Sequence, residues 1–409
     1  MVNLAVAPSE LCHVQNMALG ALKIPTYLHE LESVASLPLY EAISQFGESV
    51  KERWHSAVYQ STYRLESRRY IGCKAKLVDW IFDIIAAETE NVHSFCDIFA
   101  GTGSVANRAF TLYDRVIVND FLHSNNIIYK AFFQDAPWSK SKVLELLDRY
   151  NSIDPNTLGD NYFSINFGDK FFDMKTSRLI GFIREDLATR RPYLTEKEYA
   201  IILASLIYSI DRLANTLGHY EAYIKKAIVP RKLILRMVDV NNFRGAEIFQ
   251  EDANLLARSV QADVVYIDPP YNSRQYSRFY HLLENLVQWT KPELFGAAMK
   301  PKEENMSNYC RSSAYAAFQD LVAHVNARYL VVSYNNTYKS KSSSSENKIK
   351  LEQIEEALNN CGETHIFEHA YSPFNSGKTE FEDHKEYLFV THVDNERRNR
   401  AFATLLRGR

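Results

Sequence analysis

Residues 94–120 read SFCDIFAGTGSVANRAFTLYDRVIVND, and this stretch predicts the fold class of the chain. A short apolar run at 94–99 leads into the glycine turn Gly101–Gly103, and residues 105–112 follow with helix-like spacing. A second apolar run, 115–119, predicts a strand that lies beside the first. Strand, glycine turn, helix and strand in this order are typical of the start of a parallel α/β sheet.

Two more apolar runs and two alternating segments are expected to extend this sheet. The runs at 263–267 and 329–333 have the length and the β-branched content of buried strands. Segments 365–371 and 386–392 alternate apolar and polar residues, as two paired strands do. Between 339 and 350 the chain is rich in Ser and Lys, which predicts a mobile loop.

A long segment between these strands, residues 140–240, breaks the α/β rhythm and predicts a mainly helical insert. Helix spacing occurs near 140–150 and 195–217, with a loop-like stretch between the two. The residues that precede the first expected strand, 1–66, also show helix spacing, and this pattern predicts a helical extension that packs on or docks to the rest of the protein. The expected division is an extension at 1–66, an α/β domain in two parts at 67–139 and 241–409, and the insert at 140–240.

Composition limits the class of protein. A chain of 409 residues fits one large domain with an insertion, or two domains. With 46% apolar and 24% charged residues, a soluble globular protein is expected and disorder is not. The net charge of −3 argues against a protein that coats nucleic acid non-specifically, but it allows a local basic cleft. Aromatic residues reach 13%; most are expected in the core, and a minority could stack on bases.

Cysteine usage and hydropathy predict a location in a reducing cytoplasm. No two of the five cysteines have CxxC spacing, so neither a zinc site nor a disulfide framework is indicated. The N-terminus lacks the basic start and apolar run of a signal peptide. The most apolar stretch, 199–210, is too short to span a bilayer and is typical of a buried helix. The cysteines are Cys12, Cys73, Cys96, Cys310 and Cys361.

The glycine turn predicts close approach of a ligand to the backbone. It does not form a GxGxxG motif, because Arg108 stands where a third small residue would fall, so a dinucleotide pyrophosphate is poorly supported. A ligand without phosphates fits better, and Asp97 could then meet a positively charged amino-acid group. A plain tight turn remains the alternative.

Two acidic residues, Asp120 and Asp252, are further candidates for contact with the ligand. Asp120 ends the second strand about 20 residues after the glycines, where a carboxylate can accept hydrogen bonds from both hydroxyls of a ribose. A strand-end Asp is also often only a helix cap. Asp252, in Glu251-Asp252-Ala253, could lie beside the adenine of a cofactor, and a helix N-cap role is equally consistent.

The most specific motif is Asp268-Pro269-Pro270-Tyr271, directly after an apolar strand. Two consecutive prolines end the strand and stiffen the turn. The turn places a carboxylate, a carbonyl without a ladder partner and an aromatic ring close together, which suits a planar base bearing an amino group. Asp268 and the carbonyl of Pro269 could accept both amine hydrogens, and Tyr271 could stack on the ring.

Taken in order, four segments resemble the Dam-type family of adenine-specific DNA methyltransferases. They are Tyr70-Ile-Gly-Cys-Lys74, Phe99-Ala-Gly-Thr-Gly103, Asn119-Asp120 and Asp268-Pro-Pro-Tyr271. Ser333-Tyr-Asn-Asn336 and Lys385-Glu-Tyr-Leu-Phe-Val390 fit the later strands of that family. The resemblance covers about 67–130 and 240–393, and Cys73 stands where the family often has glycine.

The resemblance implies a Rossmann-like methyltransferase sheet with helices on both faces, and a mainly helical target-recognition insert. It implies transfer of a methyl group from S-adenosyl-L-methionine to N6 of adenine in duplex DNA, after base flipping, in a restriction-modification system. It also implies that Tyr70, Lys74, Asp120 and Asp268 line the cofactor site. With the residues above, the expected cofactor set is Tyr70, Lys74, Asp97, Phe99, Gly101, Gly103, Asp120, Asp252 and Asp268, and the catalytic set is Asp268, Pro269 and Tyr271.

Double-stranded DNA is the expected partner, gripped by local basic residues. The candidates are Lys225, Lys226, Arg231, Lys232 and Arg236, together with the loop at 339–350. Each could equally be a solvated surface charge. We also expect a monomer in the cytoplasm, associated with a prokaryotic nucleoid, no membrane contact, and a cognate restriction endonuclease acting on the same site.

Two alternatives remain from the sequence. One is an amino-methyltransferase acting on cytosine N4, RNA or protein; Asp rather than Ser at the head of the tetrapeptide favours adenine over cytosine. The other is a catalytically silent DNA-binding module, which the intact tetrapeptide argues against. A cytosine-ring methylase is disfavoured because no Pro-Cys pair stands in a suitable context.

Overall fold

The computed structural model describes residues 62–336, 348–370 and 385–403. Most of the extension expected at 1–66 lies outside the described residues, and so does the loop expected at 339–350 up to residue 347. Tyr63 is part of the described unit, because its amide donates to the carbonyl of Met237 at 2.9 Å and its side chain is buried.

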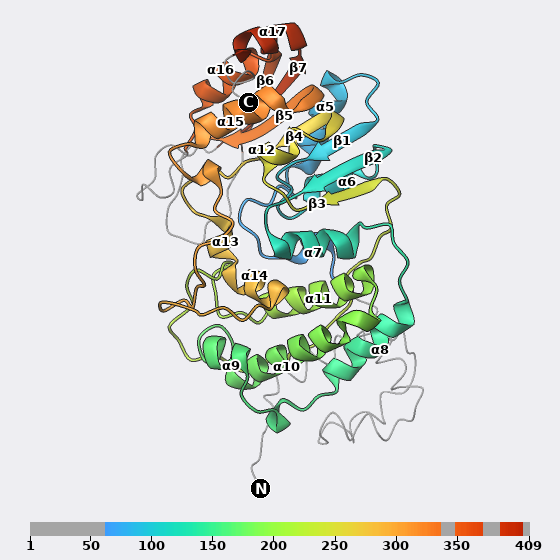
Figure 1. Ribbon diagram of the computed structural model, residues 1–409, viewed down its shortest axis with the longest axis vertical. Helices are drawn as coiled ribbons and strands as arrows, with labels where there is room; N and C mark the ends of the chain where they lie inside the picture. Colours follow the sequence, from blue (N-terminus) through green and yellow to red (C-terminus); the bar gives the residue numbers. More distant parts are fainter. Residues whose placement is uncertain (1–61, 337–347, 371–384, 404–409) are drawn as a thin grey trace, which may run out of the picture. The chain divides into compact units, whose positions relative to one another are not determined.

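The α/β part is built on a seven-stranded sheet with the strand order β3-β2-β1-β4-β5-β7-β6 (Figure 1). The strands are β1 Ser94–Asp97, β2 Arg115–Asn119, β3 Ala246–Phe249, β4 Gln261–Ile267, β5 Asn326–Asn335, β6 Gly362–Ala370 and β7 Lys385–Val393. The first five in spatial order pair in parallel, and β7 pairs antiparallel with both β5 and β6. The parallel sheet and the paired strands near the end of the chain are therefore confirmed.

Helices cover both faces of the sheet, as expected, because successive residues of a strand point to opposite sides. Phe95 packs into one core cluster and the next residue, Cys96, into the other. On the Phe95 face lie α5 Val78–Glu88, α6 Ser104–Ala109 and α7 His123–Phe132. On the Cys96 face lie α12 Ala253–Leu256, α15 Ala314–His324 and α16 Leu351–Asn359, and α17 Asn395–Ala401 ends the described chain.

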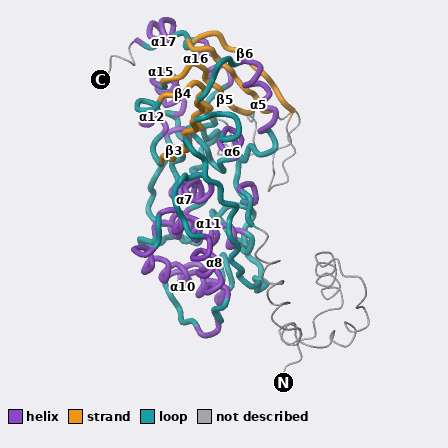
Figure 2. Tube along the Cα trace, turned by 90° about the vertical axis from the view of Figure 1, so that its right-hand side faces the viewer, coloured by secondary structure: helices purple, strands orange, loops and turns teal. Residues whose placement is uncertain are grey.

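A layer of helices follows beneath α7 (Figures 1 and 2). It consists of α8 Lys140–Asn151, α9 Tyr162–Phe167, α10 Met174–Arg190 and α11 Glu196–Asp211. The apolar stretch 199–210 lies in α11, which packs on α7 and α8 and is almost completely buried. After β4 the chain returns to this layer as α13 Tyr276–Phe279 and α14 His281–Gln288.

The prediction for the insert was wrong in two places. The stretch between its two expected helices is not a loop, because α9 and the 17-residue α10 lie there. Buried Arg184 and several surface charges interrupt the apolar spacing of α10 and conceal it in the sequence. The second expected helix ends at Asp211 rather than at 217, and Asn215 turns back to bond Phe171 and Ile224.

Short 3-10 turns connect the larger elements. They are η1 Leu65–Ser67, η2 Pro155–Thr157, η3 Arg191–Tyr193 and η4 Asn308–Cys310. In the part of the chain that the structure describes, no helix has both the length and the apolar character needed to cross a bilayer. The four cysteines within that part, Cys73, Cys96, Cys310 and Cys361, are free thiols.

Candidate active site

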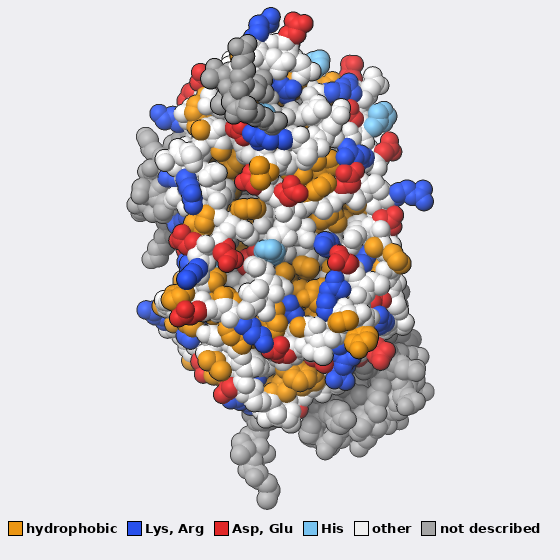
Figure 3. Space-filling view, viewed as in Figure 1, with side chains coloured by type: hydrophobic (Ala, Val, Ile, Leu, Met, Phe, Trp, Pro, Cys, Tyr) orange, Lys and Arg blue, Asp and Glu red, His pale blue; other side chains and the backbone are white. Residues whose placement is uncertain are grey.

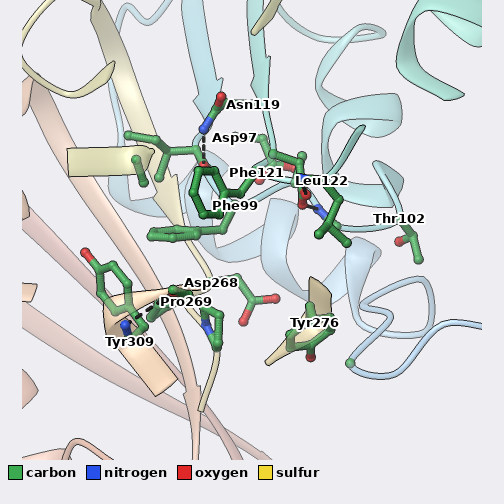
Figure 4. Close-up of a pocket in the computed structure, with 18 of the residues that line it drawn as sticks. Asp97, Phe99, Thr102, Asn119, Phe121, Leu122, Asp268, Pro269, Tyr276 and Tyr309 are labelled. Atoms are coloured by element: carbon green, nitrogen blue, oxygen red, sulfur yellow. Dashed lines mark hydrogen bonds between the residues drawn. The ribbon is translucent and has the colours of Figure 1, made fainter. Parts of the chain in front are cut away.

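A pocket opens at the carboxyl ends of the central strands. Strand β1 has β2 on one side and β4 on the other. From β2 the sheet continues outward to β3, and from β4 it continues outward on the other side to β5, so the strand order reverses at β1. Ligands of open α/β sheets bind at such a switch point, because the loops separate there. The pocket is lined by the 70–74 segment, by the ends of β1, β2 and β4, by 251–253 and by parts of 275–309 (Figure 4).

The glycine turn forms one wall of the pocket. Gly101 has φ +54°, a conformation that residues with a side chain rarely adopt, and a Cβ added there would lie in van der Waals contact, 3.4 Å from the ring of Tyr70. Gly103 also has a positive φ, +78°, but it faces Tyr129 and Phe133 of the core and does not line the pocket. Of the two glycines in the expected cofactor set, the pocket therefore includes Gly101 and not Gly103.

Asp97 ends β1 with a buried carboxylate that has no ion-pair partner among the described residues. Its side chain lines the pocket and is only 1% exposed, and neither oxygen has a well-formed hydrogen bond from a described residue. Burial, with Asp268 as a nearby like charge, raises the pKa of Asp97 well above its usual range, and the nearby backbone amide of Ala106 only partly opposes this rise. A buried carboxylate without a cationic partner is costly, so this position suits a ligand with a cationic group.

Asp120, at the end of β2, ties the glycine turn to the start of α7. One carboxylate oxygen accepts from the amide of Gly101 at 2.9 Å, and the other accepts from the amide of Leu122 at 2.8 Å. Burial raises the pKa of Asp120 to about 6. Both interpretations of this residue are thus compatible with the geometry, because the carboxylate makes local bonds and also lines the pocket.

Asp252 is the N-cap of α12, and its carboxylate accepts from the amides of Asn254 at 2.9 Å and Leu255 at 3.3 Å. It lines the pocket as well. Nearby, the ring of Phe99 meets Tyr309 edge-on at 5.0 Å. Sequence reasoning did not identify Tyr276, Ser307 and Tyr309 as pocket residues, because no motif marks them and only the fold brings them there.

The tetrapeptide after β4 presents one carboxylate oxygen to the pocket. Lys74 donates to Oδ1 of Asp268 at 2.9 Å, and the hydroxyl of Tyr271 donates to the same oxygen. Within the described chain nothing donates to Oδ2 of Asp268 or to the carbonyl of Pro269. The carboxylate points into the pocket toward Tyr276 (Figure 4). Two acceptors are thereby left at the pocket wall for a donor with two hydrogens.

Lys74 is the cation that pairs with both Asp268 and Glu386. Burial alone would lower the pKa of Lys74, but the adjacent Asp268 and Glu386 raise it above its usual range, so the ammonium form is held. The pKa of Asp268 is raised by burial, opposed by Lys74 and reinforced by Glu386. Glu386 was absent from the expected site; the sequence signal was a charged residue beside the apolar run of β7.

A second buried ion pair connects the pocket wall with the helical layer. The ring of Tyr70 stacks on Tyr280 with centroids 4.7 Å apart. The Arg68 guanidinium lies over both rings, donates to Asn125 at 2.7 Å and pairs with Asp211, the last residue of α11, at 3.5 Å. The position of Tyr70 therefore depends on an ion pair that the pocket itself does not contain.

Arg68→Met should lower the free energy of unfolding by about 3–5 kcal/mol, because it leaves the Asp211 carboxylate buried without its cation. Urea denaturation would measure the loss. The double variant Arg68→Met/Asp211→Leu should recover most of it, since both charges are then gone. A loss below about 1 kcal/mol for Arg68→Met would contradict this prediction, because it would show that the buried pair contributes no more than an exposed salt bridge does.

The basic residues expected to bind DNA lie in the segment that links α11 to β3. Lys225, Lys226, Arg231 and Lys232 are exposed, and Arg236 is partly exposed. On the face seen in Figure 3, Lys and Arg are interspersed with Asp and Glu. The start of the segment contacts α13: the amide of Tyr220 donates to the carbonyl of Phe279 at 2.7 Å. The segment that carries these cations therefore begins beside α13, the first helix after the tetrapeptide.

Comparisons with known proteins identify the family to which the chain is similar. The family model for D12 class N6 adenine-specific DNA methyltransferases matches residues 70–344. Type II methyltransferase M.NlaIII of Neisseria lactamica is 29% identical over 340 residues, which are 78% of this chain and 98% of the relative. Type II methyltransferase M.FokI of Planomicrobium okeanokoites is 32% identical over 352 residues, 80% of this chain and 53% of the relative.

Proposed function

The chain belongs to the D12 class of N6 adenine-specific DNA methyltransferases, and on that premise we propose that Asp268-Pro269-Pro270-Tyr271 holds the target adenine while the adjoining pocket binds S-adenosyl-L-methionine. The observation that carries this assignment is a pair of acceptors, Oδ2 of Asp268 and the carbonyl of Pro269, to which no described residue donates. They lie at the wall of a pocket that also contains the Asp97 carboxylate, which has no ion-pair partner among the same residues.

The pocket fits this cofactor on the evidence of its own side chains. Asp97 would pair with the α-ammonium group, which relieves the cost of an unpartnered buried carboxylate. Asp120 and Asp252 would face the ribose and the adenine, and Tyr70 and Phe99 supply apolar surface. When bound, S-adenosyl-L-methionine supplies an electrophilic methyl group on a sulfonium.

The residues of the tetrapeptide would polarise and align the target amine. Asp268 and the Pro269 carbonyl accept its two hydrogens, which directs the nitrogen lone pair into the pocket. Asp268 can also hold the proton that the amine loses. Tyr271 contributes its ring as a wall for the base. No covalent enzyme intermediate is needed, so no cysteine is given a role.

The target adenine must leave the duplex to reach this wall, because its amine is paired inside the double helix. Unstacking and unpairing cost a few kcal/mol, which contacts between protein and DNA have to offset. We assign that role to the insert 140–240 and to the segment after α11, whose contact with α13 supports a position beside the target base.

Lys225, Lys226, Arg231, Lys232 and Arg236 are proposed to contact phosphates. Replacing Lys225 or Lys226 with Ala should weaken DNA binding and reduce the slope of log K against log salt by about 0.9 for each phosphate that is no longer neutralised. Arg397→Ala removes an exposed arginine of α17, which lies outside the insert and the basic segment; it is the control and should leave the slope unchanged. Equal slopes for all of these variants would remove the two lysines from the interface.

A labelled-methyl assay tests the function. The protein is incubated with labelled S-adenosyl-L-methionine and with duplex DNA, RNA or protein as acceptor. We expect label in DNA only, recovered as N6-methyladenine, and its loss in Asp268→Ala. Label recovered as N4-methylcytosine, label in RNA or protein alone, or undiminished transfer in that variant would contradict the proposal.

The relatives' names associate them with type II systems, which supports a cognate restriction endonuclease as a further partner. The proposed enzyme acts as a monomer on nucleoid DNA in the cytoplasm. Sequencing of modified positions in methylated DNA would give the recognition site. Protection of the same site from cleavage by a co-encoded endonuclease would test the partnership.

A further inference from the structure

Glu386 lies at the centre of the hydrogen bonds around the tetrapeptide, although it is 118 residues away from Asp268 in the sequence. The sheet brings them together. Strand β4 ends just before Asp268, β5 runs parallel to it with Val332 beside Ile267, and β7 runs antiparallel with Glu386 opposite Asn335. Because β7 runs opposite to β4, the beginning of β7 with Glu386 lies at the same end of the sheet as the end of β4, which Asp268 follows. Glu386 is only 2% exposed there.

One oxygen of Glu386 receives three contacts. Ser333 donates to Oε1 at 2.7 Å, Lys74 lies 3.2 Å from the same oxygen, and the hydroxyl of Tyr271 lies 3.1 Å from it. Lys74 also contacts Oδ1 of Asp268 and the hydroxyl of Tyr271. Its ammonium therefore has two hydrogen-bond acceptors, Asp268 and Tyr271, and a second carboxylate, Glu386, as an ion-pair partner.

This arrangement decides which oxygen of Asp268 is engaged. Lys74 and Tyr271 both approach Oδ1, and neither contacts Oδ2. A lysine attracted by one carboxylate alone would be free to centre on it and cover both oxygens. A second carboxylate, Glu386, contacts the same ammonium and opposes that movement, because the cation is shared between two acceptors.

We propose that Glu386 is a positioning residue that draws Lys74 and Tyr271 onto one oxygen of Asp268, so that the other oxygen remains available for the target amine. The inference rests on the proposed function of the tetrapeptide. Glu386 touches neither cofactor nor base in this role; it acts through Lys74 and Tyr271, and Ser333 fixes its orientation.

The charge of Glu386 has a second consequence that can be measured. The groups that face Asp268 are Lys74, Asp97, Tyr266, Tyr271, Tyr276 and Glu386. Among them Glu386 raises the pKa of Asp268 and Lys74 lowers it. Removing the negative charge of Glu386 should therefore lower the pKa of Asp268, and the acid limb of the kcat–pH profile should move to lower pH.

The test compares Glu386→Gln with the wild type in DNA methylation. Gln keeps the shape and can still accept from Ser333, but it carries no charge to share Lys74. We expect kcat to fall about 10- to 100-fold, the cost of misplacing a reacting group by roughly 1 Å. Cofactor affinity should stay within about threefold, and the acid limb should shift down, which a purely structural role would not produce.

Two further variants separate position from stability. Ser333→Ala removes the bond that orients Glu386 but keeps its charge, so kcat should fall less than in Glu386→Gln and the acid limb should not move. Asp263→Asn neutralises a partly buried carboxylate near the start of β4, outside the pocket and the insert, and controls for the general cost of such a change. It should keep the wild-type kcat.

Three outcomes would overturn the inference. They are an unchanged kcat in Glu386→Gln, an unchanged kcat in Ser333→Ala, and a fall in kcat accompanied by an equal loss of cofactor affinity with an unmoved acid limb. The wild-type reaction, run in parallel, separates a failure of the proposed function from a failure of the role of Glu386. No label in DNA from the wild type would reject the proposed function itself, whereas a normal wild type with an equally active Glu386→Gln would reject only the role of Glu386.

Discussion

Asp268→Asn is expected to lower kcat for adenine methylation by about 10³-fold, the scale of losing a preorganised polar group that acts at the reacting atom. Asn preserves the shape of the side chain. Its one carbonyl oxygen would be taken by Lys74 and Tyr271, which both approach the same side of Asp268. Its amide group would then face the amine of the target base, and two donors would oppose each other.

Single-turnover kinetics with saturating DNA and cofactor would measure this loss, with cofactor affinity determined separately by titration. Affinity should change by less than about tenfold, because the interaction removed acts mainly in the transition state. Asp263→Asn is the matched control. Asp263 lies near the start of the same strand, and it accepts hydrogen bonds from the amides of His93 and Ser94 at the end of the strands away from the pocket. A wild-type rate in Asp268→Asn would remove the carboxylate from the chemistry.

Asp97→Asn should have two large effects of opposite sign. Cofactor affinity should fall by roughly 30-fold or more, since truncating one partner of a buried charge pair costs about 2–5 kcal/mol. The cofactor-free protein should become more stable by about 1–3 kcal/mol, because a buried carboxylate without a partner is replaced by a neutral amide. Calorimetric titration and urea unfolding would measure the two effects.

The pH dependence provides an independent check. The pKa of Asp97 is raised in the folded state, so the folded protein binds its proton more tightly than the unfolded chain does. The resulting stability is fully present below the unfolded pKa and is lost as pH rises through the folded pKa. The cofactor-free wild type should therefore gain stability on acidification through that raised pKa. Asp97→Asn should gain less, retaining the contributions of Asp120 and Asp268, whose pKa values are also raised.

Unfolding free energies measured between about pH 8 and pH 5 for both proteins would test this sign. Two parallel curves would show that Asp97 has the same proton affinity in the folded and unfolded chains. A less stable Asp97→Asn with unaltered cofactor affinity would contradict the assignment of Asp97 to the ammonium group, and would instead indicate a structural bond to that carboxylate.

Much of the fold could be predicted because the signals are local. The strands at 94–97, 115–119 and 261–267 are marked by apolar runs, and the glycine turn has the positive φ values that glycine permits. The 3.6-residue spacing of α10 was missed, because Arg184 is buried among its apolar residues. The Arg184 guanidinium donates to the carbonyls of Leu286 and Val287 at the end of α14. No local sequence pattern predicts this contact.

Strand-end motifs also predicted a large part of the site. Asp97, Asp120 and Asp268 each follow or end a parallel strand, and the carboxyl ends of neighbouring strands meet at one edge of the sheet. Their gathering into one pocket therefore follows from the order of local signals. Tyr276, Ser307 and Tyr309 join them from segments with no motif, so only the path of the chain after β4 brings them to the pocket.

Local sequence is enough to place a carboxylate, a carbonyl and an aromatic ring together after a strand, since two prolines impose that turn wherever it lies in the fold. Which oxygen of Asp268 is left for the amine depends instead on residues distant in the chain. Ser333 and Glu386 reach Asp268 through the strand order β4-β5-β7, and Lys74 reaches it from the segment before α5. Neighbouring residues set the backbone of a turn, whereas the packing of separate segments decides how one buried cation is shared between two carboxylates.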